Sequence, residues 1–264
     1  MYFARIEFTE IEKAIFFLQK EMNQAGYALA IVKDMALLPL AGYLLCKPLS
    51  WKEETNESVP ILLIHGSGFN QSEWLVGRQY LTNKNVYSFN WDTSKGDDIE
   101  HYTSLLEEKI NEIVEPRPNR DIILIGYSMG GLMAGYYTEY LAKSKGVNVL
   151  QVITISTPWQ GTSALKPFVN IRNFFGMKPM AKRYQQMLPQ DVSATTFLRE
   201  LNNRINNSST KYITIGSHHD LMVPYPSCHL ESATSQTTLW GFGHYSIIIS
   251  PTLWRNICEI INTK

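Results

Sequence analysis

Residues 121–137 read Asp-Ile-Ile-Leu-Ile-Gly-Tyr-Ser-Met-Gly-Gly-Leu-Met-Ala-Gly-Tyr-Tyr, and no other segment indicates the fold class as clearly. The apolar run 121–125 predicts a buried strand, and the small residues from Met129 onward predict a helix that follows at once. Between them stands Gly126-Tyr-Ser-Met-Gly130, a G-x-S-x-G motif. A strand that ends in this motif and turns directly into a helix is typical of a nucleophile elbow, which holds a serine hydroxyl off the sheet edge. The segment therefore predicts acyl-transfer chemistry at Ser128.

The two glycines of the motif have a steric reason, because a side chain at Gly126 or Gly130 would collide with the neighbouring backbone. The bare motif is weak evidence, since it arises by chance in about one chain in ten of this length. Its position between a predicted strand and a predicted helix removes most accidental matches. The alternative interpretation is a glycine-rich turn in another α/β fold, for example one that binds phosphate.

Composition narrows the class of protein. The chain has 264 residues, which fits one large α/β domain with an insertion. Its 24 Lys and Arg balance its 24 Asp and Glu, so the charge gives no support to a nucleic-acid partner. Cys46, Cys228 and Cys258 show neither a metal-ligand spacing nor a disulfide framework. Reduced thiols and an N-terminus without a signal-peptide pattern lead us to expect a cytoplasmic protein.

From residue 51 onward the pattern predicts a single catalytic domain, 51–264, in which strands and helices alternate. Strands are predicted at Ile61–Ile64, Val86–Trp91, Asp121–Ile125, Val149–Ile155, Lys211–Ile215 and Thr237–Trp240. Helices are predicted at Glu73–Leu81, Asp97–Val114, Met129–Lys143 and Pro251–Ile260. This alternation predicts an α/β fold with a mostly parallel central sheet and helices on both faces. The alternation breaks over about 159–210, where Phe and Met predict a helical lid or, alternatively, helices packed on the core.

Residues 1–50 are predicted to form a separate N-terminal helical segment. Apolar residues recur at helical spacing over 10–24, and residues 27–46 are more apolar still. Lys33 and Asp34 make a transmembrane span unfavourable. Two interpretations remain open: a pair of helices docked on the catalytic domain, or an interfacial hairpin with a proline kink that contacts a membrane surface.

A serine hydroxyl becomes a good nucleophile when a base takes its proton and an acid orients that base. After a nucleophile elbow, the acid and then the histidine follow along the chain. His244 stands in the turn Gly241-Phe-Gly-His-Tyr-Ser246, which we interpret as a flexible turn that lets a base reach over the sheet edge. Asp220 follows the predicted strand Lys211–Ile215 by a short loop. The sequence therefore predicts Ser128 as nucleophile, His244 as base and Asp220 as acid.

The loop after the first predicted strand, His65-Gly-Ser-Gly-Phe69, is predicted to form part of an oxyanion hole. Its glycines let the backbone approach a ligand closely. The N–H groups of Ser67 and Met129 are the expected donors. A phosphate cradle is the alternative for this loop, but the Lys-Ser/Thr ending of such cradles is missing.

These segments together resemble the α/β-hydrolase fold lipases and esterases, in particular the bacterial triacylglycerol lipase-like family. The resemblance covers about residues 59–262. It rests on Ile64-His-Gly-Ser-Gly-Phe-Asn70 with Trp74, Gly126-Tyr-Ser-Met-Gly-Gly131, Ile153-Thr-Ile-Ser-Thr-Pro158 with Gly161-Thr162, Leu188-Pro189 to Phe197-Leu198, Asp220-Leu-Met-Val-Pro224 and Gly243-His244. Tyr127 and Trp159 depart from the family pattern, which often has histidine at these two places.

The resemblance implies a hydrolase of carboxylic esters, lipidic ones above all, that works through a Ser-His-Asp triad and an acyl-enzyme. It implies no metal and no organic cofactor. Phe69 and Trp159 are the expected substrate contacts, and the larger aromatic at 159 is expected to alter the acyl pocket. A thioesterase, a phospholipase, another α/β-hydrolase activity or a non-catalytic binding protein of the same fold are the alternatives, because lid and pocket shape select the substrate.

Overall fold

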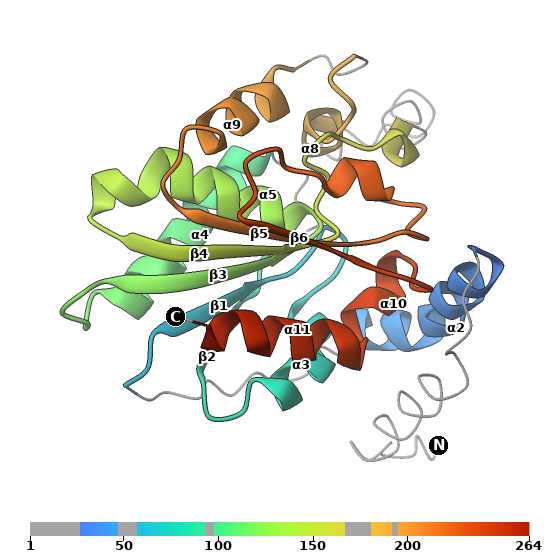
Figure 1. The fold of residues 1–264 in the computed structure, drawn as a ribbon, viewed down its shortest axis with the longest axis horizontal. Coiled ribbons are helices and arrows are strands. Elements are labelled where there is room, and N and C mark those ends of the chain that lie inside the picture. Colours follow the sequence, from blue (N-terminus) through green and yellow to red (C-terminus); the bar gives the residue numbers. More distant parts are fainter. Residues whose placement is uncertain (1–26, 47–56, 93–97, 167–180, 192–194, 264) are drawn as a thin grey trace.

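The central feature of the fold is a parallel sheet of six strands in the order β2-β1-β3-β4-β5-β6 (Figure 1). The computed structural model describes residues 27–46, 57–92, 98–166, 181–191 and 195–263. The strands are β1 Pro60–Ile64, β2 Asn85–Phe89, β3 Asp121–Tyr127, β4 Asn148–Ile155, β5 Lys211–Ser217 and β6 Ser235–Leu239. All six predicted strands and their parallel arrangement are confirmed.

Alternate residues of the central strands feed two separate hydrophobic clusters. Leu62 and Ile64 of β1 point to a cluster with α4 Ile99–Val114 and α5 Met129–Tyr136. Ile61 and Leu63 of the same strand point to the opposite cluster, with α3 Leu75–Tyr80 and α11 Pro251–Asn262. The sheet thus has helices on both faces (Figure 1). Burial on both faces explains why the strands read as continuous apolar runs.

Shorter helices complete the described part of the chain. They are η1 Gln71–Trp74, η3 Tyr137–Leu141, η4 Ala142–Lys145, η5 Ser163–Leu165, α8 Ala181–Gln186, α9 Phe197–Ile205, η6 Tyr225–Cys228 and α10 His244–Ile248. The helix predicted over 129–143 is therefore regular only at its start, since a π-helical turn and a 3-10 turn follow α5. Asp98 caps α4 by accepting a hydrogen bond from the His101 N–H at 3.0 Å.

The segment predicted as a lid, about 159–210, is described only in part, because residues 167–180 and 192–194 lie outside the described ranges. In Figure 1 its described helices α8 and α9 lie above α4 and α5, on the side away from the sheet. Phe197, Leu201 and Ile205 of α9 are buried in the cluster that contains α5. α9 therefore packs as an ordinary core helix, and a lid remains a prediction for the rest of the segment.

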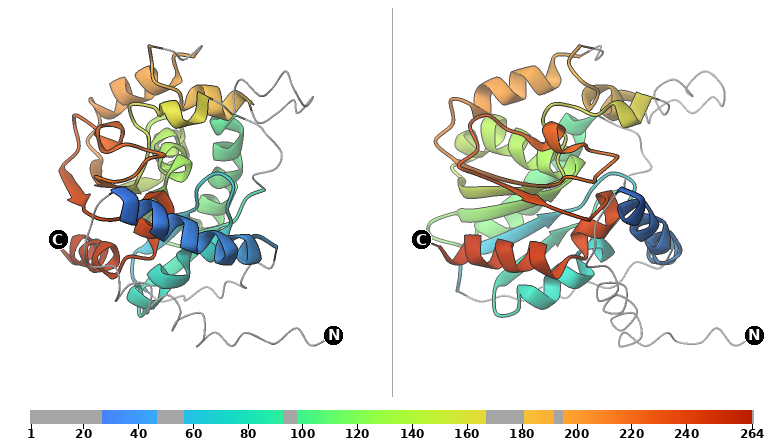
Figure 2. Two further views of the ribbon diagram at one scale, coloured as in Figure 1. Left: turned by 90° about the vertical axis from the view of Figure 1, so that its right-hand side faces the viewer. Right: turned by 45° about the vertical axis from the view of Figure 1, so that its right-hand side comes forward.

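The N-terminal segment contributes one described helix, α2 Tyr27–Cys46, which continues through Pro39. The helix predicted over 10–24 lies outside the described residues. Figure 2 shows α2 lying beside α10, and the two helices are in contact. Ala30, Lys33 and Leu37 are buried on the inner side of α2. Among the described helices, none is both long enough and apolar enough to cross a membrane.

Candidate active site

Ser128 lies on a strained turn between β3 and α5. Its φ of 51° and ψ of −124° lie in a region that L-residues rarely adopt, at a cost of about 1–3 kcal/mol. A Cβ on Gly126 would lie 2.5 Å from the Gly130 carbonyl oxygen, and a Cβ on Gly130 would collide with the Ile64 carbonyl oxygen. The steric reason predicted for both glycines is confirmed. This turn has the shape that a nucleophile elbow requires.

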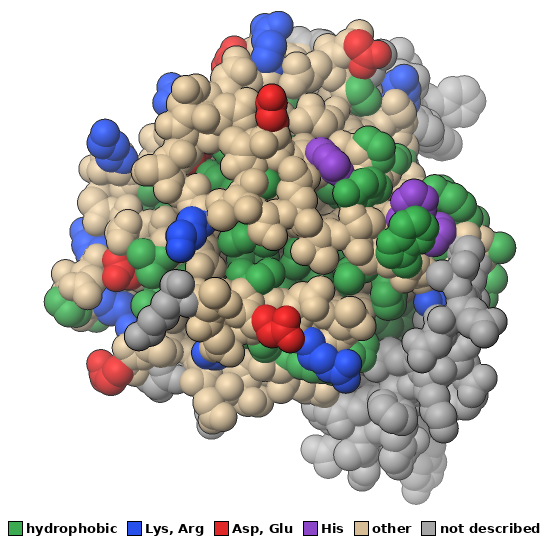
Figure 3. Space-filling view, viewed as in Figure 1, with side chains coloured by type: hydrophobic (Ala, Val, Ile, Leu, Met, Phe, Trp, Pro, Cys, Tyr) green, Lys and Arg blue, Asp and Glu red, His purple; other side chains and the backbone are tan. Residues whose placement is uncertain are grey.

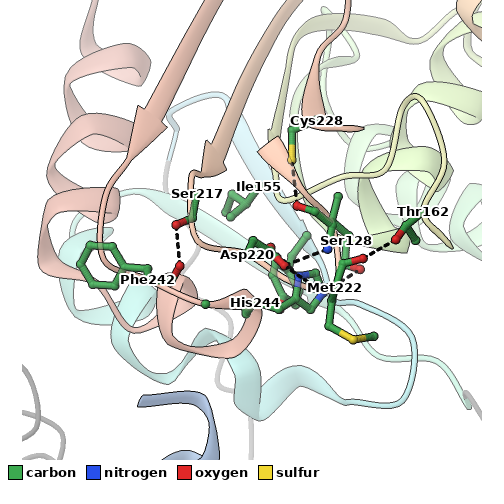
Figure 4. Close-up of polar contacts among 12 residues, drawn as sticks. Ser128, Ile155, Thr162, Ser217, Asp220, Met222, Cys228, Phe242 and His244 are labelled. Atoms are coloured by element: carbon green, nitrogen blue, oxygen red, sulfur yellow. Dashed lines mark hydrogen bonds and ion pairs between the residues drawn. The ribbon is translucent and has the colours of Figure 1, made fainter. Parts of the chain in front are cut away.

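The structure brings Ser128, His244 and Asp220 together in one hydrogen-bonded chain (Figure 4). His244 Nε2 lies 3.2 Å from Ser128 Oγ, and His244 Nδ1 lies 2.7 Å from Asp220 Oδ2. The exposed fraction is 5% for His244 and 2% for Asp220. A buried carboxylate that accepts the Nδ1–H leaves Nε2 free to take a proton from the serine.

The Asp220 carboxylate is fixed by its second oxygen. Asp220 Oδ1 accepts hydrogen bonds from the backbone N–H groups of Met222 at 2.9 Å and Val223 at 2.8 Å. These bonds orient the carboxylate toward His244 at the end of β5. The short loop after that strand is therefore built around the acid.

The base loop, residues 241–246, carries His244 and is held by side chains from two strands. The Tyr127 hydroxyl, at the end of β3, donates to the His244 carbonyl oxygen at 2.7 Å. The Ser217 hydroxyl, at the end of β5, donates to the Phe242 carbonyl oxygen at 2.5 Å (Figure 4). His219 Nδ1 accepts the Gly241 N–H at 2.9 Å. The turn interpreted as flexible from its glycines is thus anchored by specific contacts.

His65 holds the predicted oxyanion loop. Its Nδ1 lies 2.9 Å from the Gly66 carbonyl oxygen, its Nε2 accepts the Trp91 N–H at 3.3 Å, and its ring stacks on that indole. Burial lowers the pKa of the His65 imidazole from 6.5 to about 4, so this histidine is neutral. No motif in the sequence indicated this role for His65.

Glu73 holds the same residue, Gly66, at its N–H. Its Oε2 accepts the Gly66 N–H at 3.0 Å. Burial raises the pKa of the Glu73 carboxyl from 4.5 to about 8, and the hydrogen bond from Gly66 opposes that rise only in part. Gly66, the residue before Ser67, is therefore held at both its N–H and its carbonyl oxygen, which lie in two successive peptide groups.

The substitution Glu73→Gln tests the raised pKa of the Glu73 carboxyl through the pH dependence of the free energy of unfolding. The folded state binds the proton more tightly than the unfolded state, so the stabilisation is complete below pH 4.5 and is lost as pH rises to about 8. We expect the free energy of unfolding of the wild type, relative to Glu73→Gln, to fall by about 1.4 kcal/mol per pH unit across that window. Urea unfolding of both proteins from pH 5 to 9 measures the difference. A pH-independent difference would show that Glu73 is not buried in its protonated form.

A cavity of about 420 Å³ opens beside Ser128. Its lining includes the polar residues Ser67, Glu73, Ser128 and His244, and most of the other lining residues are apolar or aromatic. The apolar lining consists of Leu38, Phe69, Pro158, Leu165, Met187, Met222 and Val223. The cavity thus has both the hydrogen-bonded groups of Ser128 and His244 and a largely apolar lining.

Phe69 and Trp159, the two expected substrate contacts, differ in position. Phe69 lines the cavity, whereas Trp159 is absent from the described lining residues and is fully buried. The Trp159 indole N–H donates to Thr154 Oγ1 at 3.3 Å, and its ring packs edge-on against Tyr212. The expected role of Trp159 is corrected accordingly, because its side chain points into the core while the neighbouring Pro158 faces the cavity.

A second depression, of about 560 Å³, lies at the opposite edge of the sheet. It is lined by charged groups of both signs, among them Lys109, Arg117 and Asp121. Parallel α/β sheets bind ligands at the carboxyl ends of their strands, where Ser128 and Asp220 lie. The cavity beside Ser128 is therefore the candidate active site.

Comparison with known proteins places the chain in a family. The sequence profile of the alpha/beta hydrolase family matches residues 61–236. The chain therefore belongs to the alpha/beta hydrolase family. Among curated proteins, none matches its sequence.

Solved structures show the same fold at low sequence identity. Mature lipase BlEst2 of Bacillus licheniformis is 19% identical, with 79% of this chain and 96% of that chain covered and a TM-score of 0.61. A bromoperoxidase of Bacillus anthracis is 13% identical, with 81% and 94% covered and a TM-score of 0.59. A thermophilic esterase of Thermogutta terrifontis is 18% identical, with 78% and 90% covered and a TM-score of 0.55. A lipase, a bromoperoxidase and an esterase thus share this fold, and at such low identity the likeness shows the fold alone.

Proposed function

We propose that the protein is a serine hydrolase that cleaves carboxylic esters through an acyl-enzyme. Ser128 Oγ attacks the ester carbonyl carbon as His244 Nε2 takes the hydroxyl proton, and His244 then returns that proton to the leaving alcohol. Water, activated by the same imidazole, hydrolyses the acyl-enzyme. The observation that carries the proposal is the hydrogen-bonded chain from Ser128 through His244 to Asp220 at a strained elbow.

The oxyanion of the tetrahedral intermediate is proposed to bind the N–H groups of Met129 and Ser67. Met129 is the first residue of α5, where a backbone N–H has no partner within the helix. Ser67 lines the cavity and follows Gly66, whose carbonyl oxygen contacts His65 and whose N–H donates to Glu73. Donors fixed before the substrate binds stabilise the developing charge without reorganisation.

The proposed substrate is an ester with a long apolar acyl chain. Leu165 and Met187 come from the segment predicted as a lid, and both line the cavity. Leu38 of α2 also lines it. We propose that this apolar wall receives the acyl chain, and that the lid segment covers it.

The outer side of α2 supports contact with a lipid surface. Large hydrophobic side chains on α2 and beside it are 41–63% exposed: Ile31, Val32, Met35, Leu38, Leu221 and Trp240. Figure 3 shows hydrophobic and histidine side chains gathered on the side of the molecule where α2 lies. Because Leu38 belongs both to this surface and to the cavity wall, a lipid that enters from the surface meets the cavity directly.

A panel of p-nitrophenyl esters, from acetate to palmitate, tests the proposed function. We expect kcat/KM to rise with chain length, and detergent micelles to raise the rate on the long esters. Met35→Asp, on the exposed side of α2, should abolish most of the micelle effect, whereas Leu105→Asp on α4 should leave it unchanged. Matched acyl thioesters, run in parallel, separate an esterase from a thioesterase.

The panel has clear contrary results. A preference for acetate without any effect of micelles would replace the lipidic substrate by a short soluble ester. Absence of hydrolysis and of labelling by a fluorophosphonate probe would favour a non-catalytic member of the family.

A further inference from the structure

α2 lies outside residues 61–236, the part of the chain that matches the family, yet it contacts the loop that carries the base. Lys33 is 2% exposed, and its Nζ donates to the Gly241 carbonyl oxygen at 2.5 Å. The same ammonium group lies 4.7 Å from the centre of the Phe242 ring. A lysine is rarely buried on an otherwise apolar helix unless its charge is satisfied by specific partners.

Asp34, the next residue of α2, contacts the base loop on both sides of His244. Its Oδ1 accepts the Ser246 N–H at 2.8 Å, and the Ser246 hydroxyl accepts the Gly243 N–H at 2.8 Å. A Cβ on Gly243 would collide with the Asp34 carboxylate. The glycine before His244 thus leaves room for this carboxylate to approach from α2.

We propose that Lys33 and Asp34 are positioning residues that hold the base loop, so that His244 Nε2 stays within hydrogen-bond distance of Ser128 Oγ. The inference rests on the proposed function. It adds α2 to the elements that hold the catalytic residues in place. Neither side chain touches the substrate in this role, since both act on the backbone of residues 241–246.

The base loop is anchored from two sides, by residues at the ends of the strands and by residues of α2. Tyr127, Ser217 and His219 hold the loop from the ends of β3 and β5. Lys33 and Asp34 hold the loop from α2. Ser246 of the loop is fully buried, and its N–H donates to Asp34. Loss of Asp34 leaves a buried donor unsatisfied and frees a loop that contains two glycines. A displacement of about 1 Å between catalytic groups is enough to lower turnover by about 100-fold.

Three substitutions in the full-length protein test this inference. Asp34→Ala removes the acceptor, and we expect kcat on the best ester of the panel, and the rate of fluorophosphonate labelling, to fall about 10- to 100-fold. Asp34→Asn keeps an acceptor oxygen and should stay within about 3-fold of the wild type. Asp121→Ala is the matched control. The Asp121 carboxylate also accepts a hydrogen bond, from the side-chain amide of Asn148 at 2.7 Å, but it lies at the opposite edge of the sheet.

A readout independent of substrate accompanies the kinetics. The ¹H NMR signal of the His244 Nδ1 proton, which Asp220 accepts, should weaken or vanish in Asp34→Ala and persist in Asp34→Asn and Asp121→Ala. A merely structural role would lower the melting temperature of Asp34→Ala and leave kcat per folded molecule unchanged. That result, or an unchanged imidazole signal, would overturn the inference. If the wild type itself lacks Ser128-dependent hydrolysis, the proposed function fails, and the NMR signal still decides whether α2 positions His244.

Discussion

Ser128→Ala should lower kcat for ester hydrolysis by on the order of 10⁴–10⁶-fold, which corresponds to about 5.5–8 kcal/mol of activation free energy. The substitution removes the hydroxyl oxygen that is proposed to form the acyl-enzyme. The His244 Nε2 then has no hydroxyl to deprotonate, whereas its bond to Asp220 is retained. The variant should fold normally, because the Ser128 N–H bond to the Ile155 carbonyl oxygen at 2.8 Å does not involve the side chain.

Steady-state hydrolysis and fluorophosphonate labelling both measure this effect. Ser144→Ala is the matched control, since Ser144 is an exposed serine in η4 and is not among the residues that line the cavity. We expect the control to label and to hydrolyse like the wild type. Near-normal turnover by Ser128→Ala would exclude Ser128 as the nucleophile.

Asp220→Asn is expected to lower kcat by about 10⁴-fold, the effect known for the orienting acid of serine hydrolases with a triad. The amide retains an oxygen that can accept the N–H groups of Met222 and Val223. Its nitrogen then faces His244 Nδ1 as a donor, which favours the tautomer with the proton on Nε2. In that tautomer the imidazole cannot take a proton from Ser128, so the loss comes from the wrong tautomer and not from a collapsed site.

Asp191→Asn is the matched control for the acid, because Asp191 is an exposed aspartate in the segment 181–191. Measurement of kcat/KM from pH 6 to 10 should show a lower plateau for Asp220→Asn at every pH and an unchanged profile for the control. A large loss in Asp191→Asn together with an active Asp220→Asn would reverse the assignment of the acid.

The fold was predictable from the sequence because its signals are local. The strands are runs buried on both faces, so their apolar residues identify them without reference to their neighbours. The elbow was predictable for the same reason, since the steric demand on Gly126 and Gly130 arises within a few residues of Ser128. Helix boundaries were less accurate, and the π-helical turn at Tyr137–Leu141 has no signal in the pattern.

Side-chain directions set by distant segments were not predictable. Trp159 follows Pro158 directly, yet only Pro158 lines the cavity. The Trp159 indole instead donates a hydrogen bond to Thr154 and packs against Tyr212 in the core. The roles of His65 and Glu73 depend on both side chains reaching the backbone of one residue, Gly66. The contact of Lys33 and Asp34 with the base loop needs the complete fold, and a charged pair on an apolar helix was interpreted only as a barrier to membrane insertion.

The bond between Asp34 and Ser246 also orders events during synthesis, since it joins residues 212 positions apart. At about 5–20 residues per second, α2 leaves the ribosome roughly 10–40 s before the loop that it must hold. Contacts of such long range form late in folding, because a large chain segment has to be closed first. Nascent and partly folded chains would therefore carry Ser128 without a positioned base. The proposed hydrolysis would then begin only after the chain has closed on itself.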